Sequence, residues 1–411
     1  MKWGLRSYCS APNWANKVGH IIQCFLHPAR FQAVVGITLP QQSANLTSVK
    51  GMQSETLKSR GKPWNYEKHP YNHFYFFIDN TLKRFNDNSK VIVIDGNIGV
   101  GKTEFGKKLA EEFDMYFFPD IDSNDIFKIK NRDFDVRMVN DVLPVDVRFC
   151  DMPTFYEQKV PRPQLLRFGY TQLQMYKARY FNYLKALVHI LNTGQGVVVE
   201  RSVFSDMVFV DAMRKFKHLT PPGHRHLHYA RTNTICELWR PHLVVYLDAP
   251  VSHVREQIQK RNVPWEVKSP ALTDDFIAEI SSVYKNKYLE EMKTKSEIIQ
   301  YNVTDMPDWE IIVEDFEDVD LEPHLDADPF KFVDWMLSEI AEEDYCSYRF
   351  HVSQTEEHNS LFYFHIPFDA PEMFWNGEDA HLLNNYIDHD PAVETDPNYR
   401  GWGALFNPKM T

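Results

Sequence analysis

Residues 91–103, VIVIDGNIGVGKT, decide the fold of this 411-residue chain. The opening run, Val91 to Ile94, is apolar and β-branched, which predicts a strand that is buried on both faces. Residues 96–103 fit the pattern G-x-x-x-x-G-K-[ST], in which glycines let backbone N–H groups close around phosphate oxygens. The start of the helix that follows also favours an anion. We therefore predict a phosphate-binding loop between a buried strand and a helix.

Each position of this loop has an expected part in binding. Lys102 is expected to reach the terminal phosphates of a nucleotide, and the Thr103 hydroxyl to ligand Mg²⁺. A glycine turn that binds nothing is the alternative interpretation. The predicted phosphate-binding residues are Gly96, Asn97, Ile98, Gly99, Val100, Gly101, Lys102 and Thr103.

Apolar runs alternate with helical patterns on both sides of the loop. Helices are expected where Phe105, Leu109 and Phe113 recur, and along a longer face that ends at Gly194. Residues 120–163 are irregular and polar, like an insert or lid. Further strands are expected at 115–118, 197–199, 243–247 and 298–301. The alternation predicts a three-layer α/β fold, with a mostly parallel sheet between helices.

The N-terminus has a different composition. No acidic residue precedes Glu55, while basic residues recur through a stretch that contains serines and apolar patches. This pattern predicts a mitochondrial transit peptide and linker over residues 1–60, with a disordered basic tail as the alternative. We expect the P-loop domain to occupy residues 61–301.

The remaining residues, 302–411, form an acidic extension that also contains aromatic residues. Between Tyr301 and Tyr345 there are sixteen acidic residues and one basic residue, Lys331. Such a surface disfavours a nucleic-acid polymer as a partner. The interleaved aromatic residues favour an extension that is ordered or that docks onto another protein, and a solvated acidic face is the alternative. No apolar run approaches the roughly 18 residues of a membrane span.

The cysteines and the known redox motifs give no sign of an electron-transfer role. Five cysteines are scattered without a close pair, which predicts neither a zinc site nor a disulfide framework. The chain shows no dinucleotide fingerprint, no cysteine cluster and no haem motif.

Residues 94–103 closely resemble the phosphate loop of the deoxynucleoside kinases, which has the form G-N-I-G-x-G-K-T. A second segment, 198–205, is similar to the strand-end E-R-S motif of that family. The resemblance implies that Arg201, beside Glu200, helps to position the 5′-hydroxyl of a nucleoside. Open α/β sheets bind ligands at the carboxyl ends of their strands, so physical reasoning supports the same placement.

Two weaker matches extend the predicted nucleoside site. Gln172 resembles the base-recognising glutamine of the family, and Tyr156 resembles its sugar-contacting tyrosine. An exposed helix residue is the alternative for Gln172, and a core aromatic residue is the alternative for Tyr156. The resemblance covers roughly residues 90–301, about half of the chain.

Departures from the family pattern bear on catalysis. The family's general base is a glutamate at the end of the second strand, and Phe118 stands at the corresponding place here. A phenyl ring cannot accept a proton, so no catalytic residue is predicted unless Asp120 or Asp122 substitutes. The arginine-rich lid of the kinases is reduced to Lys260 and Arg261. We therefore expect a nucleotide pocket without efficient phosphoryl transfer.

This combination is similar to a kinase-like branch of the family whose members are accessory subunits of respiratory complex I, NADH:ubiquinone oxidoreductase. That resemblance implies other complex I subunits as partners, and a peripheral position on the matrix side of the mitochondrial inner membrane. It implies a role in assembly or stability, with a structural nucleotide and Mg²⁺. FAD has been attributed to these subunits, but the sequence shows no site for it. An active mitochondrial deoxynucleoside kinase is the alternative.

Overall fold

A computed structural model describes most of the chain. The described residues are 46–54, 62–69, 71–72, 74–75, 78–128, 134–145, 147–161, 163, 167–323, 328–335, 341–364, 369–373, 375 and 377–389. The predicted transit peptide and linker, residues 1–60, lie outside this set apart from 46–54, as does the end of the extension.

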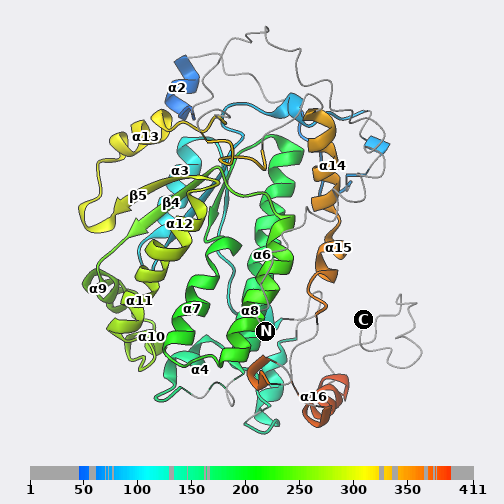
Figure 1. The fold of residues 1–411 in the computed structure, drawn as a ribbon, viewed down its shortest axis with the longest axis vertical. Coiled ribbons are helices and arrows are strands. Elements are labelled where there is room, and N and C mark those ends of the chain that lie inside the picture. Colours follow the sequence, from blue (N-terminus) through cyan, green and yellow to red (C-terminus); the bar gives the residue numbers. More distant parts are fainter. Residues whose placement is uncertain are drawn as a thin grey trace, which may run out of the picture.

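A five-stranded parallel sheet forms the centre of the molecule (Figure 1). Its strands are β1 (Val91–Gly96), β2 (Tyr116–Phe118), β3 (Val197–Glu200), β4 (Leu243–Asp248) and β5 (Glu297–Asn302). Their spatial order is β2-β3-β1-β4-β5, and every pairing is parallel. All six residues of β1 are buried, as its apolar composition predicts. The predicted fold class is confirmed.

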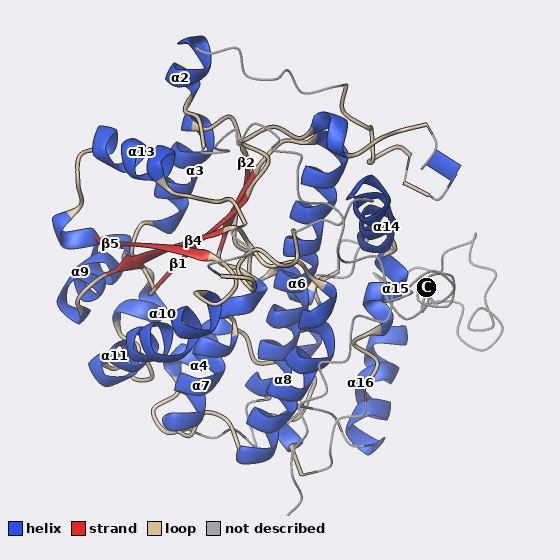
Figure 2. Ribbon diagram, turned by 45° about the horizontal axis from the view of Figure 1, so that its top comes forward, coloured by secondary structure: helices blue, strands red, loops and turns tan. Residues whose placement is uncertain are grey.

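Helices cover both faces of this sheet (Figure 2). The α3 and α13 helices lie on one face, while α7, α8 and α11 lie on the other. Together they exclude water from the sheet, as a parallel sheet requires. The α-helices are α2 (Val49–Ser54), α3 (Lys102–Glu112), α4 (Met152–Glu157), α6 (Phe168–Thr193), α7 (Met207–Lys215), α8 (Pro221–Thr234), α9 (Val251–Arg261), α10 (Pro264–Val267), α11 (Asp274–Val283), α12 (Leu289–Met292), α13 (Trp309–Asp318), α14 (Ala341–Ser353), α15 (Thr355–Ser360) and α16 (Gly377–His389). Shorter turns are the 3-10 helices Leu82–Arg84, Asp125–Phe127, Val136–Asp141, Val203–Ser205, Ile235–Glu237, Val303–Asp305 and Pro371–Met373, and the π-helix Tyr284–Tyr288.

Local sequence signals set the ends of several helices. The Thr220 hydroxyl accepts a hydrogen bond from Gly223 N at the start of α8, and Pro221 occupies the first helical position. The α6 helix ends at Gly194, which has φ +72°. A Cβ atom there would lie 2.1 Å from Arg84 O, so the close approach of that carbonyl requires glycine as well. Among the described residues, every helix is too short or too polar to cross a membrane.

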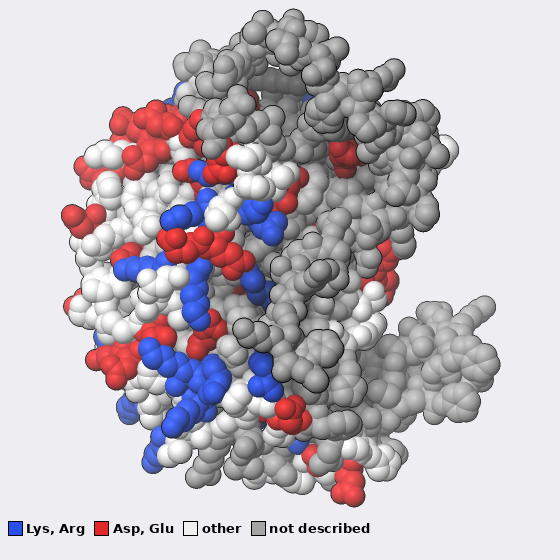
Figure 3. Space-filling view, viewed as in Figure 1, with Lys and Arg blue, Asp and Glu red and all other residues white. Residues whose placement is uncertain are grey.

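The described part of the acidic extension packs into the main core. Phe316 is fully buried beside Phe113, with ring centroids 5.8 Å apart. Tyr348 is also fully buried and stacks on Trp239, with centroids 3.8 Å apart and an interplanar angle of 5°. Acidic side chains gather on the surface over α13 (Figure 3). These two aromatic residues therefore stabilise the chain itself, whereas Phe330 of the extension is 63% exposed. Docking of the extension onto another protein stays a prediction.

Buried neutral histidines make the fold sensitive to acid. The His242 Nδ1 atom accepts a hydrogen bond from Val91 N at 3.0 Å, and burial lowers the pKa of His242 well below its usual value. Burial also lowers the pKa of His218 and of His358 to about 4. At these three histidines the unfolded chain therefore binds more protons than the folded chain below pH 6.5, so their contribution to stability is lost as the pH falls from 6.5 towards 4.

We expect the free energy of unfolding, measured with urea across this pH window, to decrease by up to about 1.4 kcal/mol per pH unit for each such histidine. His358→Gln should reduce the slope, because it removes one of the buried histidines whose pKa burial lowers. Stability that stays flat across the window in the parent chain would contradict the neutral state of these side chains.

Candidate nucleotide site

The phosphate loop has the backbone conformation that its glycines predict. Gly101 takes φ +83° immediately before α3, where left-handed backbone favours glycine. A Cβ atom on Gly96 would lie 2.6 Å from Leu247 O, so β4 approaches the loop too closely for any side chain. The loop therefore opens onto the N-terminus of an 11-residue helix, where the dipole favours phosphate oxygens.

Two polar side chains hold the loop in place. Asn97 Nδ2 donates to Ile277 O at 2.9 Å and to Ser281 Oγ at 2.8 Å, which ties the loop to α11. Lys102 is buried, and its Nζ donates to Asn97 O at 2.6 Å. Burial, together with the Arg201 cation, lowers the pKa of Lys102 to about 7. The negative charge of an incoming phosphate would favour the protonated, cationic form of Lys102.

The E-R-S motif lies at the end of β3, beside the loop. Thr103 Oγ1 donates to Glu200 Oε1 at 2.8 Å, so the predicted Mg²⁺ ligand is joined to a carboxylate. The Thr103 hydroxyl and the Glu200 carboxylate both offer oxygen atoms, which are the ligands that Mg²⁺ prefers. Arg201 has φ +58°, an unusual conformation for a non-glycine residue. Its buried Nε atom lacks a hydrogen-bond partner among the described residues, which leaves one donor available to a ligand.

A buried ion-pair network occupies the floor of the site. Arg179 on α6 bonds Asp120 with two of its nitrogens, at 2.9 and 3.2 Å, and also bonds Asp206. Gln172 Nε2 donates to the second oxygen of Asp206 at 2.8 Å. Gln172 is buried, so its interpretation as an exposed helix residue is wrong. This chain of contacts begins at Gln172 and ends at Arg201.

Asp120, and not Phe118, is the side chain that the structure brings to Arg201. Asp120 Oδ2 lies 3.8 Å from Arg201 Nη1. Burial would raise the pKa of Asp120, but Arg179 and Arg201 outweigh it and hold that pKa below its usual value. Phe118 packs instead against Tyr116 and His189, with centroid distances of 4.8 and 6.0 Å. The replacement of the base by Phe118 therefore stays a prediction from the sequence, and Asp120 is a carboxylate that lies beside Arg201.

The cavity at this site is small. Its volume is about 60 Å³, well below the roughly 300 Å³ at which ligand pockets begin. Tyr156 lines it and is buried, as its interpretation as a core aromatic residue also predicts, and burial raises the pKa of Tyr156 to about 12. Gln172, Arg179 and Arg201 supply the polar part of the wall. Its apolar part comes from Ile98, Met152, Phe155, Phe168, Met175, Phe209, Met213 and Phe276.

The predicted lid residues stand at the end of α9. Arg261 forms an ion pair with Glu266 of α10, and Gln257, one turn earlier, lies over the loop, because a Cβ atom on Gly99 would meet its Cβ at 3.2 Å. Neither Lys260 nor Arg261 lines the cavity. Among the described residues, the Asp122 carboxylate accepts hydrogen bonds from Asn124 alone, so the structure does not bring Asp122 into the site.

Sequence reasoning missed Arg179 and Asp206. Two signals in the sequence could have indicated them. Arg179 follows Gln172 by two turns of the same helix, and Asp206 follows the E-R-S motif. Neither lies in a recognisable motif of its own, so only the packing of α6 against the turn before α7 brings the two side chains together.

Comparison with known proteins identifies the family. The deoxynucleoside kinase family model matches residues 92–324, more than half of the chain. The chain belongs to the deoxynucleoside kinase family. Deoxyguanosine kinase of Dictyostelium discoideum is 24% identical over 216 residues, which cover 53% of this chain and 64% of that protein. A structure of deoxyadenosine kinase from M. mycoides with bound dATP gives a TM-score of 0.40 at 12% identity, covering 56% of this chain and all of that one.

Within this family, the chain is similar to a respiratory-chain subunit. It is 34% identical over 246 residues to bovine (Bos taurus) NADH dehydrogenase [ubiquinone] 1 alpha subcomplex subunit 10, mitochondrial. The match covers 59% of this chain and 68% of the bovine protein. The resemblance to kinase-like subunits of complex I that the sequence motifs carry is therefore confirmed.

Proposed function

We propose that this chain is a non-catalytic accessory subunit of mitochondrial complex I, which supports assembly or stability of that enzyme and keeps a nucleotide pocket. Its greater similarity to the bovine subunit than to the deoxyguanosine kinase supports the proposal. The partners are other complex I subunits, and the position is peripheral, on the matrix side of the inner membrane. The residues described here offer no feature that we can assign to FAD.

The observation that carries the proposal is the state of Asp120. A general base works best when its pKa lies near the working pH. Asp120 is instead held in ion pairs by Arg179 and Arg201, which keep its pKa low. The cavity beside it is too small for a nucleoside, and the lid supplies no free arginine because Arg261 pairs with Glu266. The site therefore lacks both a base with a pKa near neutral pH and the arginine-rich lid that efficient phosphoryl transfer in this family would use.

The phosphate loop, in contrast, keeps the residues that such loops use for phosphate and Mg²⁺. Lys102, Thr103 and Glu200 converge beside the N-terminus of α3. A ligand that binds only the folded state adds RT ln(1 + [L]/Kd) to stability. A nucleotide with Mg²⁺ would therefore stabilise the subunit without being turned over.

We expect a nucleoside triphosphate with Mg²⁺, at a hundredfold excess over Kd, to raise the free energy of unfolding of the purified full chain by about 2.7 kcal/mol. Lys102→Met should abolish this gain because it removes the cation that meets the phosphates. Lys107→Met is the matched control, because Lys107 is an exposed lysine of the same helix. An equal gain in the Lys102→Met variant would contradict nucleotide binding at this loop.

An active mitochondrial deoxynucleoside kinase is the second candidate, and the placement of Asp120 beside Arg201 favours it. This candidate predicts ATP-dependent phosphorylation of deoxynucleosides by the full chain, with a 10²- to 10⁴-fold loss in Asp120→Asn, the usual contribution of a positioned base. The proposed function predicts no turnover that depends on Asp120. Radiolabelled phosphate transfer to each of the four deoxynucleosides decides between them.

A further inference from the structure

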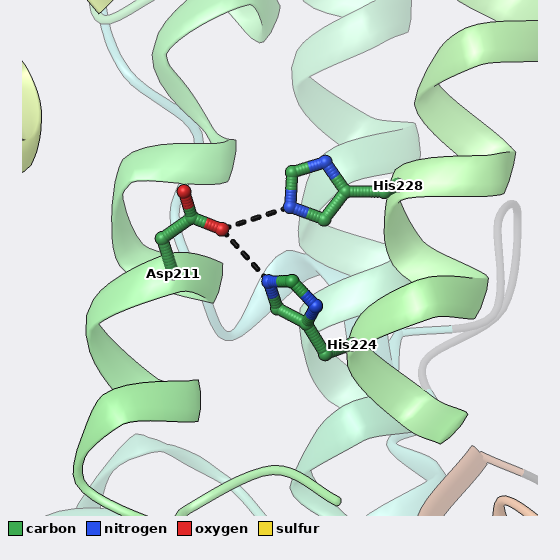
Figure 4. A group of neighbouring side chains, drawn as sticks. All are labelled: Asp211, His224 and His228. Atoms are coloured by element: carbon green, nitrogen blue, oxygen red, sulfur yellow. Dashed lines mark hydrogen bonds and ion pairs between the residues drawn. The ribbon is translucent and has the colours of Figure 1, made fainter. Parts of the chain in front are cut away.

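A second cluster of ionisable side chains lies outside the nucleotide site, where α7 packs against α8. His224 and His228 project from α8 toward Asp211 on α7 (Figure 4). The Nε2 atom of each imidazole lies 2.8 Å from the same carboxylate oxygen, Asp211 Oδ1. The nucleotide site uses none of these three residues.

The backbone holds these side chains in fixed positions. His224 and His228 are four residues apart, so they share one face of α8. Their ring centroids are 4.5 Å apart, and one ligand atom from each of the three residues lies within 4.8 Å of the others. Because the donors come from two packed helices, little conformational entropy remains to be lost when they bind an ion.

We propose that Asp211, His224 and His228 bind a divalent transition-metal ion, with Zn²⁺ as the best fit. Two imidazole nitrogens and one carboxylate oxygen are a donor set that Zn²⁺ takes, with bonds of about 2.0–2.2 Å. At tetrahedral angles, such bonds separate the donor atoms by about 3.3 Å. Each nitrogen would therefore retreat from Asp211 Oδ1 by about half an ångström from its 2.8 Å contact. The ligand atoms of the two histidines, which lie within 4.8 Å of each other, would take up the same separation of about 3.3 Å.

The surroundings leave room for a fourth ligand. The side chains of His224 and His228 are 27% and 38% exposed, so a water molecule can complete the coordination from the solvent side. Three protein ligands with one open position are typical of sites where a metal stays accessible. Asp211 is more buried, with 11% exposure, as suits the ligand at the base of the site.

Lys287 completes the arrangement. Its Nζ lies 2.6 Å from the second carboxylate oxygen, Asp211 Oδ2, and its side chain is 65% exposed. This contact occupies Oδ2 and leaves the other oxygen, Oδ1, to the two imidazoles. Its positive charge also opposes a cation. Without a metal, two imidazole N–H groups and one ammonium would saturate the same carboxylate, so measurement must separate the two states.

The cysteine pattern alone could not reveal this site, because it contains no cysteine. The signal in the sequence is the H-x-x-x-H spacing at His224 and His228, which lacks its third member until the fold supplies Asp211. The prediction that the cysteines form no zinc site therefore does not apply to a site built from histidine and aspartate.

The test is Zn²⁺ binding to the tag-free full chain, in competition with a chromophoric chelator. We expect one equivalent to bind, and His224→Asn or His228→Asn to weaken its affinity by at least about 100-fold, since loss of an outer partner alone typically costs 10- to 100-fold. His253→Asn, a histidine on α9 outside the cluster, should have no effect. Co²⁺ in place of Zn²⁺ should give the visible absorption of a tetrahedral site, and lose it in the two variants.

Lys287→Met keeps all three ligands and serves if a histidine variant fails to fold. We expect it to bind Zn²⁺ roughly tenfold more tightly than the parent chain, because it removes a charge that repels the ion. Unaltered affinity in His224→Asn and His228→Asn, or the lack of a stoichiometric Zn²⁺ ion in the parent chain, would overturn the proposal. If both histidine variants fail to fold, an unaltered Zn²⁺ affinity in Lys287→Met would overturn the proposal.

Discussion

Tyr348→Ala is expected to lower the free energy of unfolding by about 3–5 kcal/mol, the usual cost of truncating a buried aromatic residue. Tyr348 lies in the extension but is fully buried in the main core, stacked on Trp239. Its hydroxyl accepts from Trp239 N at 2.8 Å and donates to Glu237 O at 3.2 Å. Urea unfolding of the full chain measures the loss, which combines a cavity with an unpaired backbone amide.

The matched control is Tyr363→Ala, because Tyr363 lies in the same extension and its ring is 79% exposed. That variant should change stability by less than about 0.5 kcal/mol, as surface substitutions usually do. A similar small effect for Tyr348→Ala would mean that the extension unfolds independently of the P-loop domain. The account of the extension as part of one core would then be wrong.

Arg179→Met is expected to cost about 3–5 kcal/mol near neutral pH, because it leaves a buried charge without its partner. Asp206 is fully buried, and apart from Arg179 its recorded partner is Gln172. Burial already raises the pKa of Asp206, so in this variant the carboxyl can take up a proton as the pH falls. The loss should therefore shrink on mild acidification, which urea unfolding at two pH values can show.

Two further variants test this explanation. Asp206→Asn in the Arg179→Met background should restore part of the stability, because it removes the uncompensated charge. Arg225→Met breaks an exposed pair with Asp369, in which the two side chains are 67% and 62% exposed, and should cost less than about 1 kcal/mol. Equal losses for Arg179→Met and Arg225→Met would show that the buried network does not stabilise the site.

The sheet could be predicted closely because its signals are local. The apolar run at Val91 to Ile94 became β1, and the glycine pattern became the loop before α3. The predicted strand 298–301 lies within β5, Glu297–Asn302. In each case, short β-branched runs between turn residues leave little choice of conformation, so a parallel sheet follows from their alternation with helices.

The side chains that meet across the site could not be predicted in this way. Arg179, Asp120 and Asp206 come from three separate segments, and nothing local marks them as neighbours. The same holds for Asp211 and the two histidines of α8. The aromatic residues of the extension were visible, but whether they pack inside the chain or onto a partner depends on the space that Trp239 and its neighbours leave.

The placement of Asp120 shows how a small shift changes an interpretation. Counting along the second strand puts Phe118 at the position of the general base, whereas the chain beyond Pro119 turns Asp120 toward Arg179 and Arg201. A carboxylate is thus present, but it is neutralised by two arginines. The question of activity therefore depends on the electrostatics of Asp120 rather than on its absence.

Blue-native electrophoresis of detergent-solubilised mitochondria tests the central claim most directly, with an antibody to this chain and an in-gel stain for complex I activity. The proposed function predicts that the chain migrates with the active complex I band, and that depletion of the chain reduces that band. A chain that runs as a small soluble species, and whose depletion leaves the complex I band intact, would contradict the account.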